Sequence, residues 1–140
     1  MFNSLNVSAS GLTAERLRMD VISENIANAN TTRTASGMPY RRKVVTFETK
    51  GESFSNHFNR EMNELKGVEV TKISEDQSPF KKVYEPGHPD ANEEGYVLKP
   101  NVEIVNEMAN MISATRAYEA NVTAINNTKN MAQSALNIGR

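Results

Sequence analysis

The chain lacks cysteine and tryptophan and has only two histidines among its 140 residues. Without cysteine there can be no disulfide, no thiolate metal site and no cysteine nucleophile. Two histidines leave little material for acid–base catalysis or for histidine-based metal binding. The sequence also has no run of about 18 apolar residues, the length that would predict a membrane-spanning helix. These absences argue against a disulfide scaffold, a membrane-spanning protein and most classes of enzyme.

The net charge and the apolar content are both low. Lys and Arg number 16 and Asp and Glu number 17, so the formal net charge is −1. Near-neutrality gives no general attraction to nucleic acid or to anionic lipid. Leu, Ile, Val and Phe together supply 29 residues, just above the level of roughly 20% below which chains tend towards disorder. We therefore expect one domain that buries surface against partners as well as against itself.

The first segment predicts an amphipathic helix over residues 3–29. Apolar residues recur at every seventh position, at Leu5, Leu12, Met19 and Ile26. Asn3 and Ser4 are residue types that favour the position just before a helix. The polar cluster at residues 28–32 ends the apolar pattern and so predicts the end of the helix.

The last segment carries the strongest pattern in the chain. Pro100 and Asn101 form a helix start signal, and Glu103 would lie in the first turn, where negative charge is favoured. Seam positions then alternate in steps of four and three: Ile104, Met108, Met111, Thr115, Tyr118, Val122, Ile125, Lys129, Ala132 and Leu136. Thirty-eight helical residues would span roughly 57 Å, whereas a compact domain of this size is roughly 35–40 Å across. Such a helix must protrude, pair with the first helix or pack into an assembly.

The middle segment contains all five prolines. It predicts short strands at residues 43–49, 68–73 and, more weakly, 80–84. Residues 53–65 have apolar side chains at helical spacing but could equally form a loop, and residues 85–95 have the composition of a loop.

Together these patterns predict a mainly α fold with a small β part. The long N- and C-terminal helices would pair as a coiled coil, and the middle would be an irregular, strand-containing segment. The expected division is residues 1–30, 31–100 and 101–140.

The densest group of possible metal ligands comprises His88, Asp90, Glu93 and Glu94. Its spacing does not match a known calcium loop, because the glycine and ligand positions of an EF-hand are missing. Two prolines and a glycine make it a turn-rich surface loop, where acidic clusters are usually solvated. We therefore expect no bound metal and no cofactor.

Tyr40, Arg41, Arg42 and Lys43 form the one basic cluster. A single short patch in a near-neutral chain is weak evidence for nucleic-acid binding. A solvated face, or contact with the acidic groups of a partner, is the favoured interpretation. The chain also has neither a nucleophile elbow nor a glycine-rich phosphate loop, so the sequence predicts that it is not an enzyme and does not bind nucleic acid.

Asparagine is unusually frequent, with 17 residues, seven of them in the predicted C-terminal helix. Asparagine is a mediocre helix former. The amides could form a tolerated polar face, or they could bond neighbouring helices and fix their register. The sequence leaves these alternatives open.

Two terminal motifs resemble a known family. Ser8–Leu12 (SASGL), followed by Asn25–Thr32 (NIANANTT), resembles the N-terminal signature of flagellar axial proteins, which are rod, hook and hook-associated subunits. Asn101–Met108 (NVEIVNEM) and Ala114–Asn121 (ATRAYEAN) resemble the signature that closes rod and hook proteins.

Further motifs in the middle of the chain are similar to those of the proximal-rod members of this family. They are Ser78–Phe80 (SPF), Tyr84–Ala91 (YEPGHPDA), Glu94–Val97 (EGYV) and Pro100–Asn101 (PN). Residues 51–66 are the least diagnostic part, and nothing is transferred to them.

The resemblance implies a structural subunit of the bacterial flagellar basal body. Such subunits assemble through their terminal helices into the hollow proximal rod that transmits torque. They leave the cell unfolded through the flagellar type III export channel, without a cleaved signal peptide, and assemble in the periplasm. Residues 1–20 lack the features of a cleavable signal, which by itself would suggest the cytoplasm; the resemblance replaces that interpretation. The implied partners are other copies, related rod proteins and the adjoining export-gate or MS-ring adaptor.

On this basis we expect packing between helices at Leu5, Leu12, Met19, Ile26, Met111, Tyr118, Val122 and Ile125. We expect orienting polar contacts at Arg116, Glu119 and Asn121. Two alternatives remain at this level. A secreted coiled-coil chaperone or translocon-like module would form discrete oligomers, and a metal-dependent hydrolase centred on His88 would require a bound ion.

Overall fold

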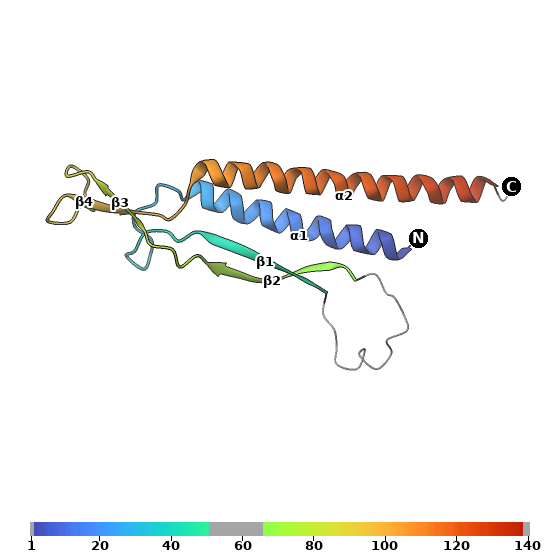
Figure 1. Cartoon of the computed structure of the whole chain (residues 1–140), viewed down its shortest axis with the longest axis horizontal. Coiled ribbons are helices and arrows are strands. Elements are labelled where there is room, and N and C mark those ends of the chain that lie inside the picture. The colour runs from blue at the N-terminus through green and yellow to red at the C-terminus, as the bar shows by residue number, and fades with distance from the viewer. Residues whose placement is uncertain (1, 51–65, 139–140) are drawn as a thin grey trace, which may run out of the picture. The chain divides into compact units, whose positions relative to one another are not determined.

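The computed structural model describes residues 2–50 and 66–138 (Figure 1). In chain order the elements are α1 (Phe2–Ala27), β1 (Lys43–Thr49), β2 (Val68–Glu75), β3 (Lys81–Tyr84), β4 (Tyr96–Lys99) and α2 (Ile104–Ile138). The predicted mainly α fold with a small β part between two long terminal helices is confirmed. Residues 53–65, for which a helix and a loop were both considered, lie outside the described residues.

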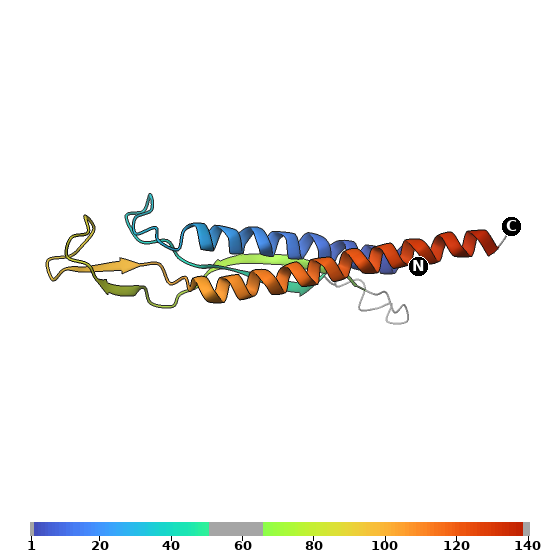
Figure 2. The same ribbon diagram turned by 90° about the horizontal axis from the view of Figure 1, so that it is seen from above.

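The chain divides into two compact units. The first comprises residues 1–18, 46–72 and 113–140, and the second comprises residues 19–45 and 73–112. Each unit therefore contains a stretch of α1 and a stretch of α2. In both views these two stretches run side by side within their unit (Figures 1 and 2).

α1 begins at Phe2, one residue before the predicted start, and ends at Ala27, two residues before the predicted end. Asn3 and Ser4 lie inside the helix, so the prediction that they precede it is wrong. At the other end, both the backbone N–H and the side-chain amide of Asn28 donate to the carbonyl of Glu24, at 3.1 and 3.0 Å. The side-chain amide therefore adds a second donor to a carbonyl that already accepts a helical bond in the last turn.

α2 begins at Ile104 and not immediately after Asn101. The carbonyl of Glu103 accepts the N–H of Glu107 at 2.9 Å. Glu103 therefore stands at the boundary of the helix and not in its first turn. Glu107 is the acidic residue of that turn.

The strands form two separate two-stranded sheets, β1 with β2 and β3 with β4. Lys50 N–H donates to the Gly67 carbonyl at one end of the first sheet, and Asp76 N–H donates to the Arg42 carbonyl at the other, both at 2.8 Å. Those pairings make β1 and β2 antiparallel. In the second sheet, the register runs from Lys81 opposite Lys99 to Tyr84 opposite Tyr96.

The three predicted strands are confirmed, with β2 extending to Glu75, but β4 was missed. β4 is only four residues long and follows a loop rich in turn residues, so its own periodicity is too short to detect. Its start depends on a turn in which Gly95 has a φ of +81° and the Asn92 side chain accepts the N–H of Tyr96 at 2.8 Å.

Small residues set the close approach of the helices in the first unit. Ala14 is 5% exposed and Ala114 is fully buried. A β-carbon at Gly11 would lie only 3.0 Å from the amide nitrogen of Asn121. Because Gly11 has no side chain, the Asn121 amide can pack against it without a steric clash.

β2 also approaches α1 closely in this unit. Ser10 Oγ accepts the N–H of Val68 at 3.0 Å and donates to the carbonyl of Val7 at 2.7 Å. A β-carbon at Gly67 would collide with Oγ and would lie 2.9 Å from the β-carbon of Ser10. Only glycine fits beside Ser10 without displacing it.

We expect Gly67→Ala to lower the free energy of unfolding by about 1–3 kcal/mol, the usual cost of overpacking. The added methyl group must displace Ser10 and so lengthen its bond to Val68. Urea unfolding of the purified full-length chain measures the effect. Gly87→Ala is the control, because a β-carbon there meets no atom within 4 Å. Equal losses in the two variants would show that the Ser10 contact does not matter.

Candidate functional site

The inward-facing side chains of the helices in the second unit include both apolar and polar residues. Val21 and Ile22 of α1 are each 5% exposed, whereas Asn25 of α1 and Glu107 of α2 are each 1% exposed. A carboxylate this deeply buried is costly unless it is paired and hydrogen-bonded. The surroundings of Glu107 therefore decide whether the helices can pair here.

Asn25 uses both ends of its side chain. Its amide nitrogen donates to Glu107 Oε2 at 3.0 Å and to the carbonyl of Lys43 at 2.9 Å. Its amide oxygen accepts the Tyr40 hydroxyl at 3.0 Å and the N–H of Lys43 at 2.9 Å. One side chain of α1 thus binds α2 and the start of β1 together.

Arg42 supplies the charge that balances Glu107. Its Nε and one terminal nitrogen each lie 2.8 Å from Glu107 Oε1, and the other terminal nitrogen lies 3.5 Å from Asp76 Oδ2. The backbone N–H of Arg42 donates to the side-chain oxygen of Asn101 at 2.8 Å. The Asn101 amide nitrogen in turn donates to the Asp76 carbonyl at 3.0 Å. We call Asn25, Tyr40, Arg42, Asn101 and Glu107 the polar cluster.

The polar cluster corrects our interpretation of the basic residues at 40–43, for which we had favoured a solvated face or the acidic groups of a partner. Arg42 and Lys43 form ion pairs with acids of the same unit, Lys43 with Glu24. The Arg41 guanidinium lies 4.4 Å from the centre of the Phe80 ring, a cation–π distance. Acids distant in sequence neutralise Arg42 and Lys43, and a local sequence pattern cannot detect that.

The residues of the polar cluster come from separate motifs. Asn25 opens the second N-terminal motif, whereas Asn101 and Glu107 belong to the motif at the start of α2. Sequence reasoning recognised both motifs but assigned no role to Asn25 or Glu107. One signal was available, because Glu107 precedes buried Ala114 by one heptad and Asn121 by two.

Large apolar side chains lie on the outer face of α2. In the second unit they are Ile104, Val105, Met108 and Ile112, with exposed fractions from 42% to 72%. Val122, Met131 and Leu136 are likewise exposed in the first unit. This distribution is the reverse of a self-sufficient helix pair, in which large apolar residues face inward.

The residues predicted to form an assembly interface occupy two kinds of position. Half-buried ones are Leu5, Leu12, Met19, Ile26, Met111, Tyr118, Asn121 and Ile125. Exposed ones are Arg116, Glu119 and Val122. The predicted seam is therefore split: positions 111, 118 and 125 flank the buried face of α2, while positions 108, 122 and 136 point outward. The Asn121 side chain donates to the Ala117 carbonyl at 3.0 Å.

The candidate metal ligands are not gathered into a metal site. His88 Nδ1 accepts the N–H of Asp90, while the Asp90 carboxylate accepts the hydroxyl of Thr32 at 2.8 Å and lies 3.9 Å from Arg33. Among residues 2–50 and 66–138, no group of three or more His, Cys, Asp or Glu side chains is placed to hold an ion. The hydrolase alternative has no support here.

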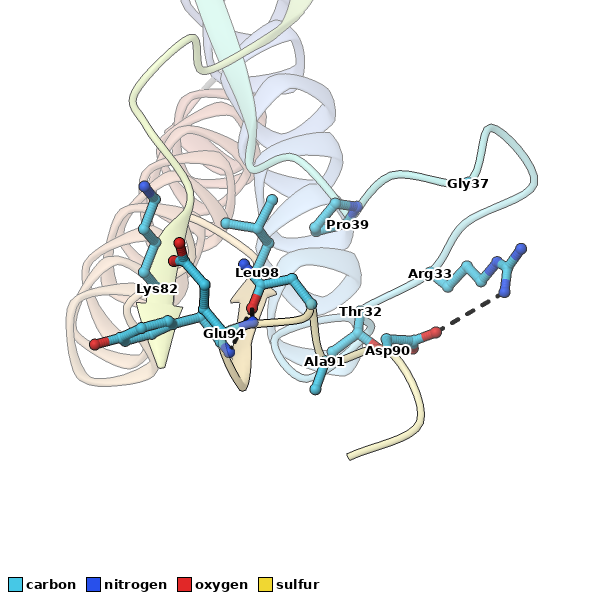
Figure 3. Close-up of a pocket in the computed structure, with 11 residues that line it drawn as sticks. Thr32, Arg33, Gly37, Pro39, Lys82, Asp90, Ala91, Glu94 and Leu98 are labelled. Carbon is cyan, nitrogen blue, oxygen red and sulfur yellow. Dashed lines mark hydrogen bonds and ion pairs between the residues drawn. The ribbon is translucent and has the colours of Figure 1, made fainter. Parts of the chain in front are cut away.

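Asp90 instead borders a cavity of about 740 Å³ in the second unit (Figure 3). Its lining comprises Thr32, Arg33, Gly37, Pro39, Lys82, Asp90, Ala91, Asn92, Glu94, Tyr96 and Leu98. The lining mixes cations, anions and apolar groups without a nucleophile–base pair, so it suggests no catalytic chemistry.

Neither described helix is long and apolar enough to cross a membrane.

Burial in the polar cluster also affects Tyr40. Loss of solvent, together with the nearby carboxylates of Glu24, Glu107 and Glu75, raises the pKa of its hydroxyl to about 12. Because the folded state holds this proton more tightly than the unfolded state, Tyr40 contributes stability that is fully present below pH 10. That stability is lost as the pH rises towards 12.

We therefore expect the wild-type chain to lose stability between about pH 10 and pH 12 more steeply than Tyr40→Phe. The variant has no proton to release at this position. Urea unfolding at a series of pH values from 8 upward measures both slopes. Parallel slopes would mean that the hydroxyl is as free to ionise in the folded state as in the unfolded one.

Comparison with known proteins connects these features to one family. Residues 5–33 match the family model described as "Flagella basal body rod protein". Residues 93–138 match the model described as "Flagellar basal body rod FlgEFG protein C-terminal". Asn25 lies within the first match, and Asn101 and Glu107 lie within the second.

Several curated relatives cover the whole chain, and each is named flagellar basal-body rod protein FlgC. The protein from Bacillus subtilis is 56% identical over 99% of this chain and 98% of its own length. The protein from Borreliella burgdorferi is 48% identical over 99% and 97%, and that from Escherichia coli O6:H1 is 39% identical over 100% and 98%. Nothing in these matches supports a chaperone or translocon module. The chain belongs to the FlgC family of flagellar basal-body rod proteins.

Proposed function

We propose that this structural rod protein joins its neighbours through the helix faces that it leaves exposed. The observation that carries the proposal is the outward position of Ile104, Val105, Met108 and Ile112 on α2. As a member of a family of structural rod proteins, the chain is not an enzyme. Its activity is therefore the binding of neighbouring subunits.

The physical driving force is burial of apolar surface. Covering an exposed side chain of this size contributes up to about 1.5–3 kcal/mol when burial is complete. Several such side chains along one helix exceed the scattered exposed apolar residues that any soluble surface carries. A neighbouring helix with an apolar face would remove them from water together.

The interface residues divide by exposure. Leu5, Leu12, Met19 and Ile26 on α1 are half-buried within the chain and keep some surface for a neighbour. Met111, Tyr118 and Ile125 have the same position on α2, and Val122 is exposed. Arg116 and Glu119 are exposed and of opposite charge, so they can orient an incoming subunit. Asn121 lies against Gly11 of the same unit, which favours a contact within the chain.

The contacts between subunits would be heterologous, because different faces meet in an open-ended assembly. We assign the rod core to residues 1–30 and 101–140 and the outer, strand-containing layer to residues 31–100. Long helices packed side by side, as in a coiled coil, would give a hollow proximal rod the stiffness to transmit torque.

The remaining features of the proposal follow from family resemblance. The subunit would pass unfolded through the flagellar type III export channel, without a cleaved signal peptide, and assemble in the periplasm. The absence of cysteine suits an unfolded chain bound for an oxidising compartment. Its partners would be further copies, related rod proteins and the adjoining export-gate or MS-ring adaptor.

We expect Met108→Asp to be exported normally but to fail in rod assembly. Met108 is 55% exposed, so the chain itself tolerates a carboxylate at this position. In a packed assembly the charge would be buried without a partner, which costs several kcal/mol, or roughly a hundredfold or more in affinity. Cells whose only copy is the variant should secrete the subunit, lack completed rods in electron micrographs of basal bodies, and not swim.

Asn127→Asp is the control, because it adds the same charge at an exposed polar position of α2. It should assemble if the amide-rich face is solvated. Normal motility of Met108→Asp would remove the outer face from the interface, and a variant that stays inside the cell would give that face a role in export. Failure of Asn127→Asp would add the amide-rich face to the interface.

A further inference from the structure

We propose that Glu107 fixes the register of α1 against α2, with Asn25 and Arg42 as its recognition partners. The carboxylate is 1% exposed, and its oxygens lie 3.0 Å from the Asn25 amide and 2.8 Å from the Arg42 guanidinium. The alignment itself is a property of the single chain. Only its consequence for the rod rests on the proposed function.

The other contacts between the helices select register weakly. Ala14, Ala114 and Gly11 are small, and a small residue can replace another small residue after a shift with little change in packing. Val21 and Ile22 are buried as well, but their apolar contacts are non-directional. A helix pair held by these residues alone would accept several alignments.

Glu107 makes those alternatives unfavourable. A shift of one helical turn would bring Glu103 or Met111 opposite Asn25, and a shift of one heptad would bring Ala114 there. In either case the Glu107 carboxylate would leave both of its partners, and a buried charge without partners is strongly destabilising.

Asn25 cannot follow the carboxylate, because its side chain is already held. Its oxygen accepts Tyr40 and Lys43, and its nitrogen also binds the Lys43 carbonyl. This set of bonds fixes the amide of α1 to the start of β1. The position of the donor to Glu107 is therefore defined by two elements and not by α1 alone.

A second contact agrees with the same alignment. Asn121 lies against Gly11, and Asn25 follows Gly11 by two heptads, just as Asn121 follows Glu107. In two continuous antiparallel helices, contacts that lie at equal intervals along both helices belong to one register. The contact of Glu107 with Asn25 and the contact of Asn121 with Gly11 therefore fit the same register.

A buried ion pair is in general weak evidence for stability, since well-packed apolar residues often stabilise as much or more. The distinctive contribution of the polar cluster is alignment. In the second unit the register decides where exposed Met108 and Ile112 stand relative to half-buried Met19 and Ile26 of α1. An interface for a neighbour composed of both helices exists only in one register.

The test replaces the cluster by apolar residues and measures the alignment directly. The variant carries Asn25→Leu, Arg42→Met and Glu107→Leu. Because the natural chain has no cysteine, introduced pairs report register without a competing thiol. Gly11→Cys with Asn121→Cys reports the native alignment. Gly11→Cys with Ala114→Cys or with Thr128→Cys reports a shift of one heptad in either direction, with Asn121→Ala added to leave room for the cysteine at position 11.

In the purified full-length chain with the cluster intact, we expect the 11–121 disulfide to form at least about tenfold faster than either shifted disulfide. In the apolar variant we expect similar rates for all three, with the helical circular dichroism and the thermal midpoint retained or raised. Glu107→Gln alone, with Asn25 and Arg42 unchanged, keeps an acceptor for Asn25 and should retain the native preference. Glu103→Gln, which changes an exposed carboxylate one turn earlier, should not alter it.

Two results would overturn the proposal. If the apolar variant still forms only the 11–121 disulfide, other contacts set the register. If it loses its helical signal, the cluster is required for folding and not for alignment. Neither readout involves a rod, so a native register in a chain that does not assemble would count against the proposed function alone.

Discussion

The rest of the structure depends on one buried carboxylate. Glu107 is stable in the interior of its unit only because Asn25 donates to one oxygen and Arg42 pairs with the other. That requirement brings α1, α2 and the start of β1 to one point, since Asn25 also holds Lys43 through both of its backbone groups. Coulombic attraction in a region of low dielectric constant is strong, but only for groups in the correct positions. The main effect of this interaction is therefore to fix the relative positions of α1, α2 and the start of β1 at this point.

Large apolar side chains of α2 lie on its outer face and not on the face towards α1. On its inner side α2 presents small and polar side chains such as Ala114 and Glu107, while Met108 and Ile112 are exposed on its outer face. A protein that functions alone would gain by reversing this arrangement. In the assembly that we propose, the outer face of one copy would become interior once neighbours cover it. The exposed apolar face and the aligned inner face would then serve the same assembly.

Much of the fold was predictable because it depends on local periodicity. A heptad pattern over five turns or more specifies a helix whatever surrounds it, and α1 and α2 were placed within three residues at the ends that the structure describes. β1 was placed at its observed bounds because its apolar and β-branched residues form a run between turn signals. β4 was missed because four residues carry too little pattern, and its position depends on the turn at Gly95.

The sequence by itself determined the helices, the small β part and, through motifs at both ends, the family. Only the tertiary structure decided which face of each helix is inside. The heptad pattern predicted a seam containing Met108 and Met111, but the buried face is centred on Glu107 and Ala114. Periodicity records which residues share a face, whereas burial depends on partners from distant segments. Arg42 and Asn25, which neutralise and bind Glu107, lie 65 and 82 residues away from it in the chain, beyond the reach of any local pattern.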